Sequence, residues 1–191
     1  MKKAIIIFVL VLISNFSFSQ ESFSHAIGPA GFLGTRNATL HSVGLIYAPR
    51  LNLFEVGKSS TFSIGTYFGV GYNLDYKFVD DNQITVHIPV IIEYNFGLAS
   101  NRNNYQNKNG GFLGIGYSFE QAGMYVNTGN RSKDLIVKKA INGPIANIGY
   151  RFKIASEPFS IRASYLYGTG DFNGGYLATL SILYNMGLNK Q

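Results

Sequence analysis

Few residues of the chain could carry chemistry, and four of them lie on the same, mostly polar face of the strands that the sequence predicts. Glu93, Arg151 and Arg162 are charged, and His87 lies six positions before Glu93. In an extended strand His87 and Glu93 therefore point to the same face. An unpaired buried charge is costly, so a buried carboxylate needs a cationic partner. The sequence predicts a buried network of Glu93, Arg151, Arg162 and His87, in which Glu93 pairs with Arg151 or Arg162.

Two roles for this network follow from its composition. It could fill and stiffen a closed interior, or it could line a path for protons, ions or small polar solutes. Lys153 has the same parity as Arg151 and would belong to the same face. We expect the filled interior, with the path for protons, ions or small solutes as the alternative.

Enzyme chemistry finds little support in the sequence. The histidines are His25, His41 and His87, and Ser42 follows His41 directly, so their side chains would point to opposite faces of a strand. There is no cysteine, which removes thiolate nucleophiles and thiolate metal sites. Metal-ligand spacings, phosphate-binding glycine loops and nucleophile elbows are also missing. We expect no catalytic, cofactor-binding or metal site.

A second group of cations is predicted to lie in a loop. Arg131, Lys133, Lys138 and Lys139 are close in sequence, with Asp134 the nearby acid. Lysine and arginine bind phosphate through charge-assisted hydrogen bonds. This loop is therefore a candidate contact for anionic lipid, with an ordinary solvated loop as the alternative. The formal net charge is +6, but no Lys/Arg run is dense enough to indicate nucleic-acid binding.

The elements that must position these residues are strands. From Ile84 to Leu98 the even positions are apolar or aromatic, whereas the odd positions are mostly small or polar. This period of two is that of a strand between two different environments. The same pattern predicts eight strands, around residues 40–53, 62–73, 84–98, 113–119, 122–127, 146–152, 159–167 and 176–188.

The composition of the polar face indicates which face points outward. A soluble lipocalin-like barrel would place its apolar face inside and many charges outside. Here the polar face is mostly Ser, Gly, Asn, Thr and Tyr. Such residues suit the crowded interior of a narrow eight-stranded barrel, so the bulky apolar face would contact lipid.

The spacing of aromatic residues agrees with a membrane thickness. Phe62 and Tyr72 share a face and lie about 33 Å apart along a strand. A strand tilt of about 45° reduces this to roughly 23 Å, close to an apolar band about 25 Å tall between aromatic girdles. Phe159 with Tyr167, and Tyr176 with Tyr184, repeat the pattern on a shorter spacing.

The N-terminus has the features of an export signal. Lys2 and Lys3 precede an apolar run from Ala4 to Ile13, and Ser17 and Ser19 are the small residues expected before a cleavage site. We therefore expect a signal peptide at residues 1–19, an N-terminal leader at 20–38 and a transmembrane barrel at 39–191.

Loop lengths suggest how the barrel is oriented. With both chain ends on the inner side, the outer loops would be residues 50–60, 100–110, 128–143 and 168–174. The inner turns would be residues 75–82, 120–121 and 155–158.

The segments Ile88–Gly97 and Leu183–Gly187 are similar to strands of the small outer-membrane β-barrel superfamily, in its outer membrane protein beta-barrel domain members. The resemblance implies an all-β, eight-stranded, antiparallel up-and-down barrel in a Gram-negative outer membrane. It also implies lipid and lipopolysaccharide as surroundings and an envelope protein as a possible partner. We expect a structural or surface-interaction role, with a narrow pore and a lipid-modifying enzyme as alternatives.

Overall fold

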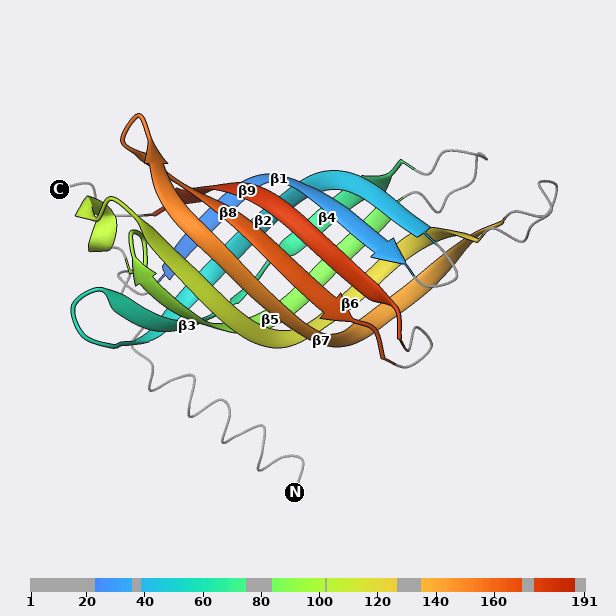
Figure 1. Ribbon diagram of the computed structural model, residues 1–191, viewed down its shortest axis with the longest axis horizontal. Coiled ribbons are helices and arrows are strands. Elements are labelled where there is room, and N and C mark those ends of the chain that lie inside the picture. Colours follow the sequence, from blue (N-terminus) through green and yellow to red (C-terminus); the bar gives the residue numbers. More distant parts are fainter. Residues whose placement is uncertain are drawn as a thin grey trace, which may run out of the picture.

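A computed structural model of the chain describes residues 23–35, 39–74, 84–101, 103–126, 135–169 and 174–187. These residues form strands and one short 3-10 helix, η2 (Asn104–Gln106) (Figure 1). The strands are β1 (Phe23–Thr35), β2 (Thr39–Glu55), β3 (Ser60–Thr66), β4 (Phe68–Asn73), β5 (Ile84–Gly97), β6 (Gly110–Val126), β7 (Leu135–Ile154), β8 (Glu157–Tyr167) and β9 (Tyr176–Met186).

The strands close into an antiparallel barrel. Strands that follow one another in sequence pair with each other, except β3 and β4, and β1 also pairs with β9, which joins the first strand to the last. β3 and β4 are two halves of one strand interrupted at Tyr67, because both lie between β2 and β5. With β3 and β4 counted as one strand, the barrel has eight strands, which confirms the predicted eight-stranded up-and-down fold.

The expectation of an N-terminal leader at residues 20–38 was wrong for its main part. Residues Phe23–Thr35 form β1 and pair with β2 along its whole length. Pro29 and three glycines dilute the alternation of this strand, although Phe23, Ile27 and Leu33 still face outward. The barrel therefore begins at Phe23, and the predicted signal peptide lies outside the described residues.

The predicted turn at Glu120–Gln121 was also wrong. β6 continues through it to Val126 and remains paired with β7 over its whole length. The short predicted strand at 122–127 is the end of β6. The predicted count of eight was therefore reached with one strand missed and another divided.

These two corrections change which end of the barrel each loop occupies. β1 begins and β9 ends at one end, here called the terminal end, together with residues 56–59, 98–109 and 155–156 (Figure 1). Residues 74–83, 127–134 and 168–175 connect strands at the opposite end. The predicted outer loops 50–60 and 100–110 therefore lie at the end where β1 begins and β9 ends, because the missed strand reversed the direction of the strands that follow it.

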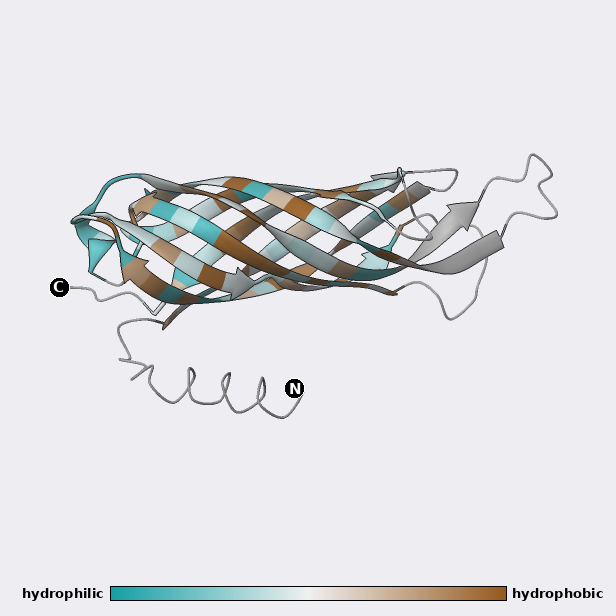
Figure 2. Cartoon of the chain, turned by 90° about the horizontal axis from the view of Figure 1, so that it is seen from below, coloured by the Kyte–Doolittle hydropathy of each residue, from teal (hydrophilic) through white to brown (hydrophobic). Residues whose placement is uncertain are grey.

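The two faces of the wall differ as the alternation predicted. Bulky apolar side chains are exposed on the outside, including Leu45, Ile115 and Ile148. Figure 2 shows the alternating hydropathy along the strands. The inside holds buried polar residues and also bulky apolar ones, among them Phe32, Leu40, Ile46, Ile91, Ile141, Ile145, Leu166, Leu177 and Leu183. In the described part of the chain, no helix has the length and apolarity to cross a membrane.

Candidate functional site

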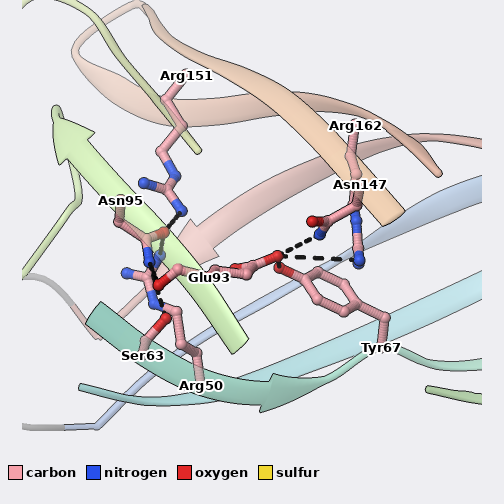
Figure 3. Close-up of polar contacts among 8 residues, drawn as sticks. All are labelled: Arg50, Ser63, Tyr67, Glu93, Asn95, Asn147, Arg151 and Arg162. Carbon is pink, nitrogen blue, oxygen red and sulfur yellow. Dashed lines mark hydrogen bonds and ion pairs between the residues drawn. The ribbon is translucent and has the colours of Figure 1, made fainter. Parts of the chain in front are cut away.

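Glu93 is the centre of a buried polar cluster inside the barrel. Its side chain points inward from β5 and is 1% exposed. The Tyr67 hydroxyl donates to Oε1 of Glu93 at 2.5 Å, and the Asn147 amide donates to the same oxygen (Figure 3). Nη2 of Arg162 lies 3.9 Å from this oxygen, and the Arg162 guanidinium stacks over the Tyr67 ring. The carboxylate therefore accepts two hydrogen bonds, from the β3–β4 junction and from β7, and forms an ion pair with β8.

Asn95 organises a second group, closer to the terminal end. Its Oδ1 accepts hydrogen bonds from Nη1 of Arg50 at 2.7 Å and from Nη2 of Arg151 at 2.6 Å. Its Nδ2 donates to Oγ of Ser63 at 2.8 Å. Figure 3 shows the two guanidinium groups approaching Asn95 from different strands. One neutral amide thus orients two buried cations.

The structure separates the predicted network into parts. Arg162 is the ion-pair partner of Glu93, whereas Arg151 bonds to Asn95. His87 is buried, but its Nδ1 contacts the carboxylate of Glu120 rather than Glu93.

Lys153, which was expected on the same inward face as Arg151 and Arg162, has a different environment. It is only partly buried, and its ammonium lies over the Tyr105 ring, 4.4 Å from the ring centroid.

The sequence did not predict that several of these residues would lie in the interior. Arg50 was assigned to a loop and Glu120 to a turn, so neither was considered for the interior. Both continue the inward parity of their strands, Arg50 with Ser42 and Glu120 with Ser118. Extending the alternation beyond the expected strand ends would have found them. Tyr67 has the inward parity of the predicted strand over residues 62–73, but parity did not indicate that it would contact Glu93.

The loop after β5 folds over the terminal end of the barrel. Leu98, Ala99 and Ser100 are buried, and Nη2 of Arg50 donates to the Ala99 carbonyl at 2.6 Å. Oδ1 of Asn101 accepts hydrogen bonds from the backbone N–H groups of residues 103 and 104. This loop, predicted as a long outer loop, is thus an ordered cover joined to the buried arginine.

Of the four cations predicted to lie in a loop, the structure describes the backbone of two. Arg131 and Lys133 lie outside the described residues. Lys138 and Lys139 belong to β7, where their backbones pair with Gly123 and Ala122 of β6, so the expected loop of residues 128–143 is shorter than predicted. Their position is close to the opposite end of the barrel.

Aromatic rings line the outside of the wall near the terminal end. Phe54, Phe62, Tyr94 and Phe96 form one series of ring contacts, with centroids 5.0 to 6.2 Å apart. A second series runs through Tyr150, Phe152, Phe159 and Tyr184, from β7 to β9. Tyr72, Tyr117, Tyr165, Tyr167 and Tyr176 are exposed nearer the opposite end. The rings therefore lie in two bands, as girdles at two water–lipid boundaries would.

The described arrangement offers charge pairing and hydrogen bonding among buried side chains. Within the described ranges, no three His, Cys, Asp or Glu residues come close enough to hold a metal ion. The described polar contacts of His87 involve Glu120, whose Oε1 also accepts from the Ser118 hydroxyl at 3.3 Å.

Comparison with solved structures identifies the fold. Neisserial surface protein A matches with a TM-score of 0.57 and 10% sequence identity, over 89% of this chain and 98% of that one. Ail, the attachment invasion locus protein of Yersinia pestis, matches with a TM-score of 0.52 and 15% identity, over 87% and 99%. No protein-family profile matches the sequence, and no curated protein does. The chain has the fold of the small outer-membrane β-barrels, as the resemblance implied.

Proposed function

We propose that this protein is a non-enzymatic barrel of the outer membrane, with a filled interior and a structural or surface-interaction role. The observation that carries the proposal is the inversion of its two faces. Bulky apolar side chains cover the outside, whereas ion-paired and hydrogen-bonded groups lie within. An apolar exterior of this extent favours lipid over water as the surrounding medium.

Heat-modifiable gel migration of the outer-membrane fraction tests the location. A folded barrel resists unfolding by detergent at room temperature, so its band should shift after boiling. Absence of the protein from that fraction, with recovery from the soluble fraction, would refute a membrane barrel.

The filled interior is supported by its burial. Side chains from four different strands are each less than 2% exposed: Arg151, Phe32, Leu40 and His87. The cover formed by Leu98 and its neighbours lies over one end. We therefore expect no single-channel current in planar bilayers. Discrete current steps that depend on the protein would favour the narrow pore instead.

The surface role concerns the end of the barrel opposite the terminal end. Arg131, Lys133, Lys138 and Lys139 supply positive charge in and beside the loop at this end, and lipopolysaccharide phosphates are the anions expected there. On the same fold, Ail was crystallised in complex with the heparin analogue sucrose octasulfate, which is a polyanion. An envelope protein partner remains a further proposal for this end.

Changing Lys133, Lys138 and Lys139 to alanine tests the contact. We expect weaker association of the refolded barrel with lipopolysaccharide and a smaller dependence on salt. Lys58→Ala with Lys108→Ala is the matched control, because both lysines are exposed at the terminal end. Unchanged association in the triple variant would refute the contact. The enzyme alternative predicts a change in the mass of lipopolysaccharide or phospholipid on incubation, and we expect none.

A further inference from the structure

The buried charges inside the barrel do not balance locally. Among the described residues, the buried cations are Arg50, Arg151 and Arg162, and the buried carboxylates are Glu93 and Glu120. Glu93 contacts Arg162, and Glu120 contacts His87. Arg50 and Arg151 therefore share only a neutral acceptor, Oδ1 of Asn95.

These two guanidinium groups are close together. Both donate to the same oxygen atom, at 2.7 and 2.6 Å, so the two donating nitrogens cannot be farther apart than these distances combined. Two like charges this close in a medium of low polarity repel each other. An additional negative charge beside them would stabilise the folded barrel.

Arg151 has donors available for that charge. The side chain is 2% exposed, and its Nε and Nη1 donate no hydrogen bond to any described residue. Arg50, by contrast, uses Nε, Nη1 and Nη2 on Ser24, Asn95 and Ala99. The Phe112 ring lies 4.5 Å from the Arg151 guanidinium carbon and offsets its charge only in part, because a ring face is a weak counter-charge.

A small cavity lies beside both arginines. Its volume is about 20 Å³, and its lining includes Arg50, Arg151, Ser24, Ser160 and Asn185. A volume of about 10–15 Å³ by this measure is enough for one water-sized occupant. A chloride ion is of that order. His25 and Met186 also line the cavity, so it lies towards the terminal end.

We propose that this cavity binds one small inorganic anion of the chloride class between Arg50 and Arg151. The anion accepts a hydrogen bond from one of the two available donors of Arg151, Nε or Nη1, which point to different sides of the guanidinium group, and it offsets the repulsion between the two arginines. A water molecule would accept the same hydrogen bond but would leave the two positive charges uncompensated. The site does not depend on the surface role proposed above.

Bromide replaces chloride and can be located by its anomalous scattering. Crystals of the wild-type barrel grown in bromide should show an anomalous peak within hydrogen-bonding distance of Arg151 and close to Arg50. The absence of a peak there, with water density in its place, would overturn the proposal. This measurement needs no variant and is independent of any effect of mutation on folding.

Chloride binding in solution gives a second measurement. Adding the refolded barrel to a chloride solution should broaden the chloride-35 NMR signal, and Arg151→Met should abolish this excess broadening. A folded Arg162→Met variant is the matched control, since it removes a buried cation but leaves Arg50, Arg151 and the cavity in place. Equal broadening by wild type and by a folded Arg151→Met variant would contradict the site, as would loss of broadening only in the folded Arg162→Met variant.

Discussion

At the residue scale, the inside of the barrel is a set of polar groups that stabilise one another. An eight-stranded barrel has room for side chains but not for bulk water, so each inward charge must find its partners among its neighbours. Glu93 contacts Tyr67, Asn147 and Arg162, all of which are buried. The energetic value of this cluster depends on the carboxylate that joins its members.

Removing that carboxylate should destabilise the barrel strongly. Glu93→Ala leaves Arg162 without its ion-pair partner, and breaking a buried pair in this way costs about 3–5 kcal/mol. Glu93→Gln keeps an acceptor for Tyr67 and Asn147, so its cost should be smaller, on the order of 1–3 kcal/mol. Urea unfolding followed by gel migration measures both. A Glu93→Ala variant as stable as wild type would contradict this account of the cluster.

The residues of this cluster were only partly predictable from the sequence. Glu93 was expected to pair with Arg151 or Arg162, since all three have inward parity, and the structure brings Glu93 together with Arg162. The pairing of His87 with Glu120 was not expected, because Glu120 had been placed in a turn. Parity gives the face on which a residue lies but not its position along the barrel axis. Two inward side chains contact each other only if the strand register places them at the same level, as it does for His87 and Glu120.

At the scale of the element, glycines let neighbouring strands approach closely. Gly116 of β6 pairs with Ile91 of β5, and a Cβ atom added there would clash with the backbone carbonyl oxygen of Val90. That neighbour is backbone and cannot rotate away. Gly31 of β1 differs, because the nearest atom to an added Cβ is the Ser42 carbonyl oxygen at 4.0 Å.

We therefore expect opposite results from two similar substitutions. Gly116→Ala should destabilise the barrel by about 1–3 kcal/mol, since the strands must shift to make room. Gly31→Ala, the matched control, should be neutral or slightly stabilising, because alanine restricts the unfolded chain more than glycine does. Midpoints of urea unfolding compare the two variants. Equal midpoints would show that close packing of β5 on β6 does not limit stability.

The strands themselves were predicted well where alternation was strong and poorly where it was weak. β5, β8 and β9 were found close to their observed bounds. β1 was missed because its inward positions are Ser, Ala and Gly, with Phe32 as the exception, so they resemble a flexible segment. What makes these residues a strand is pairing with β2 and β9 on both sides, which is a property of the closed barrel.

At the scale of the whole molecule, the barrel exposes apolar side chains all around its wall. Ile115 is 71% exposed and pairs with Ile92 and Ala146, in the middle of β5 and β7. Ile154 is 54% exposed and ends β7 at the terminal end. If lipid surrounds the wall, these two sites lie at different depths.

Arginine at the two positions should therefore have different costs. Ile115→Arg should cost about 2–4 kcal/mol, the range for the middle of a bilayer, and Ile154→Arg only about 0–1 kcal/mol, the range near its surface. Unfolding from lipid vesicles provides the free energies. Equal costs at both positions, or a gain at Ile115, would be incompatible with a wall that spans a membrane.

Much about this protein could be determined from the sequence by itself, because alternation along a strand is a local property. Alternation was sufficient for the strand type and for the inward parity of Glu93 and Arg162, and the composition of the polar face indicated that the apolar face points outward. The count of eight was reached because one missed strand was offset by one divided strand. Only the tertiary structure decided where the chain enters the barrel, which loops share an end, and that Arg50 and Arg151 meet at Asn95. The physical reason is closure: the position of each strand depends on both of its neighbours, and the first and last strands of the chain are neighbours only once the barrel has closed.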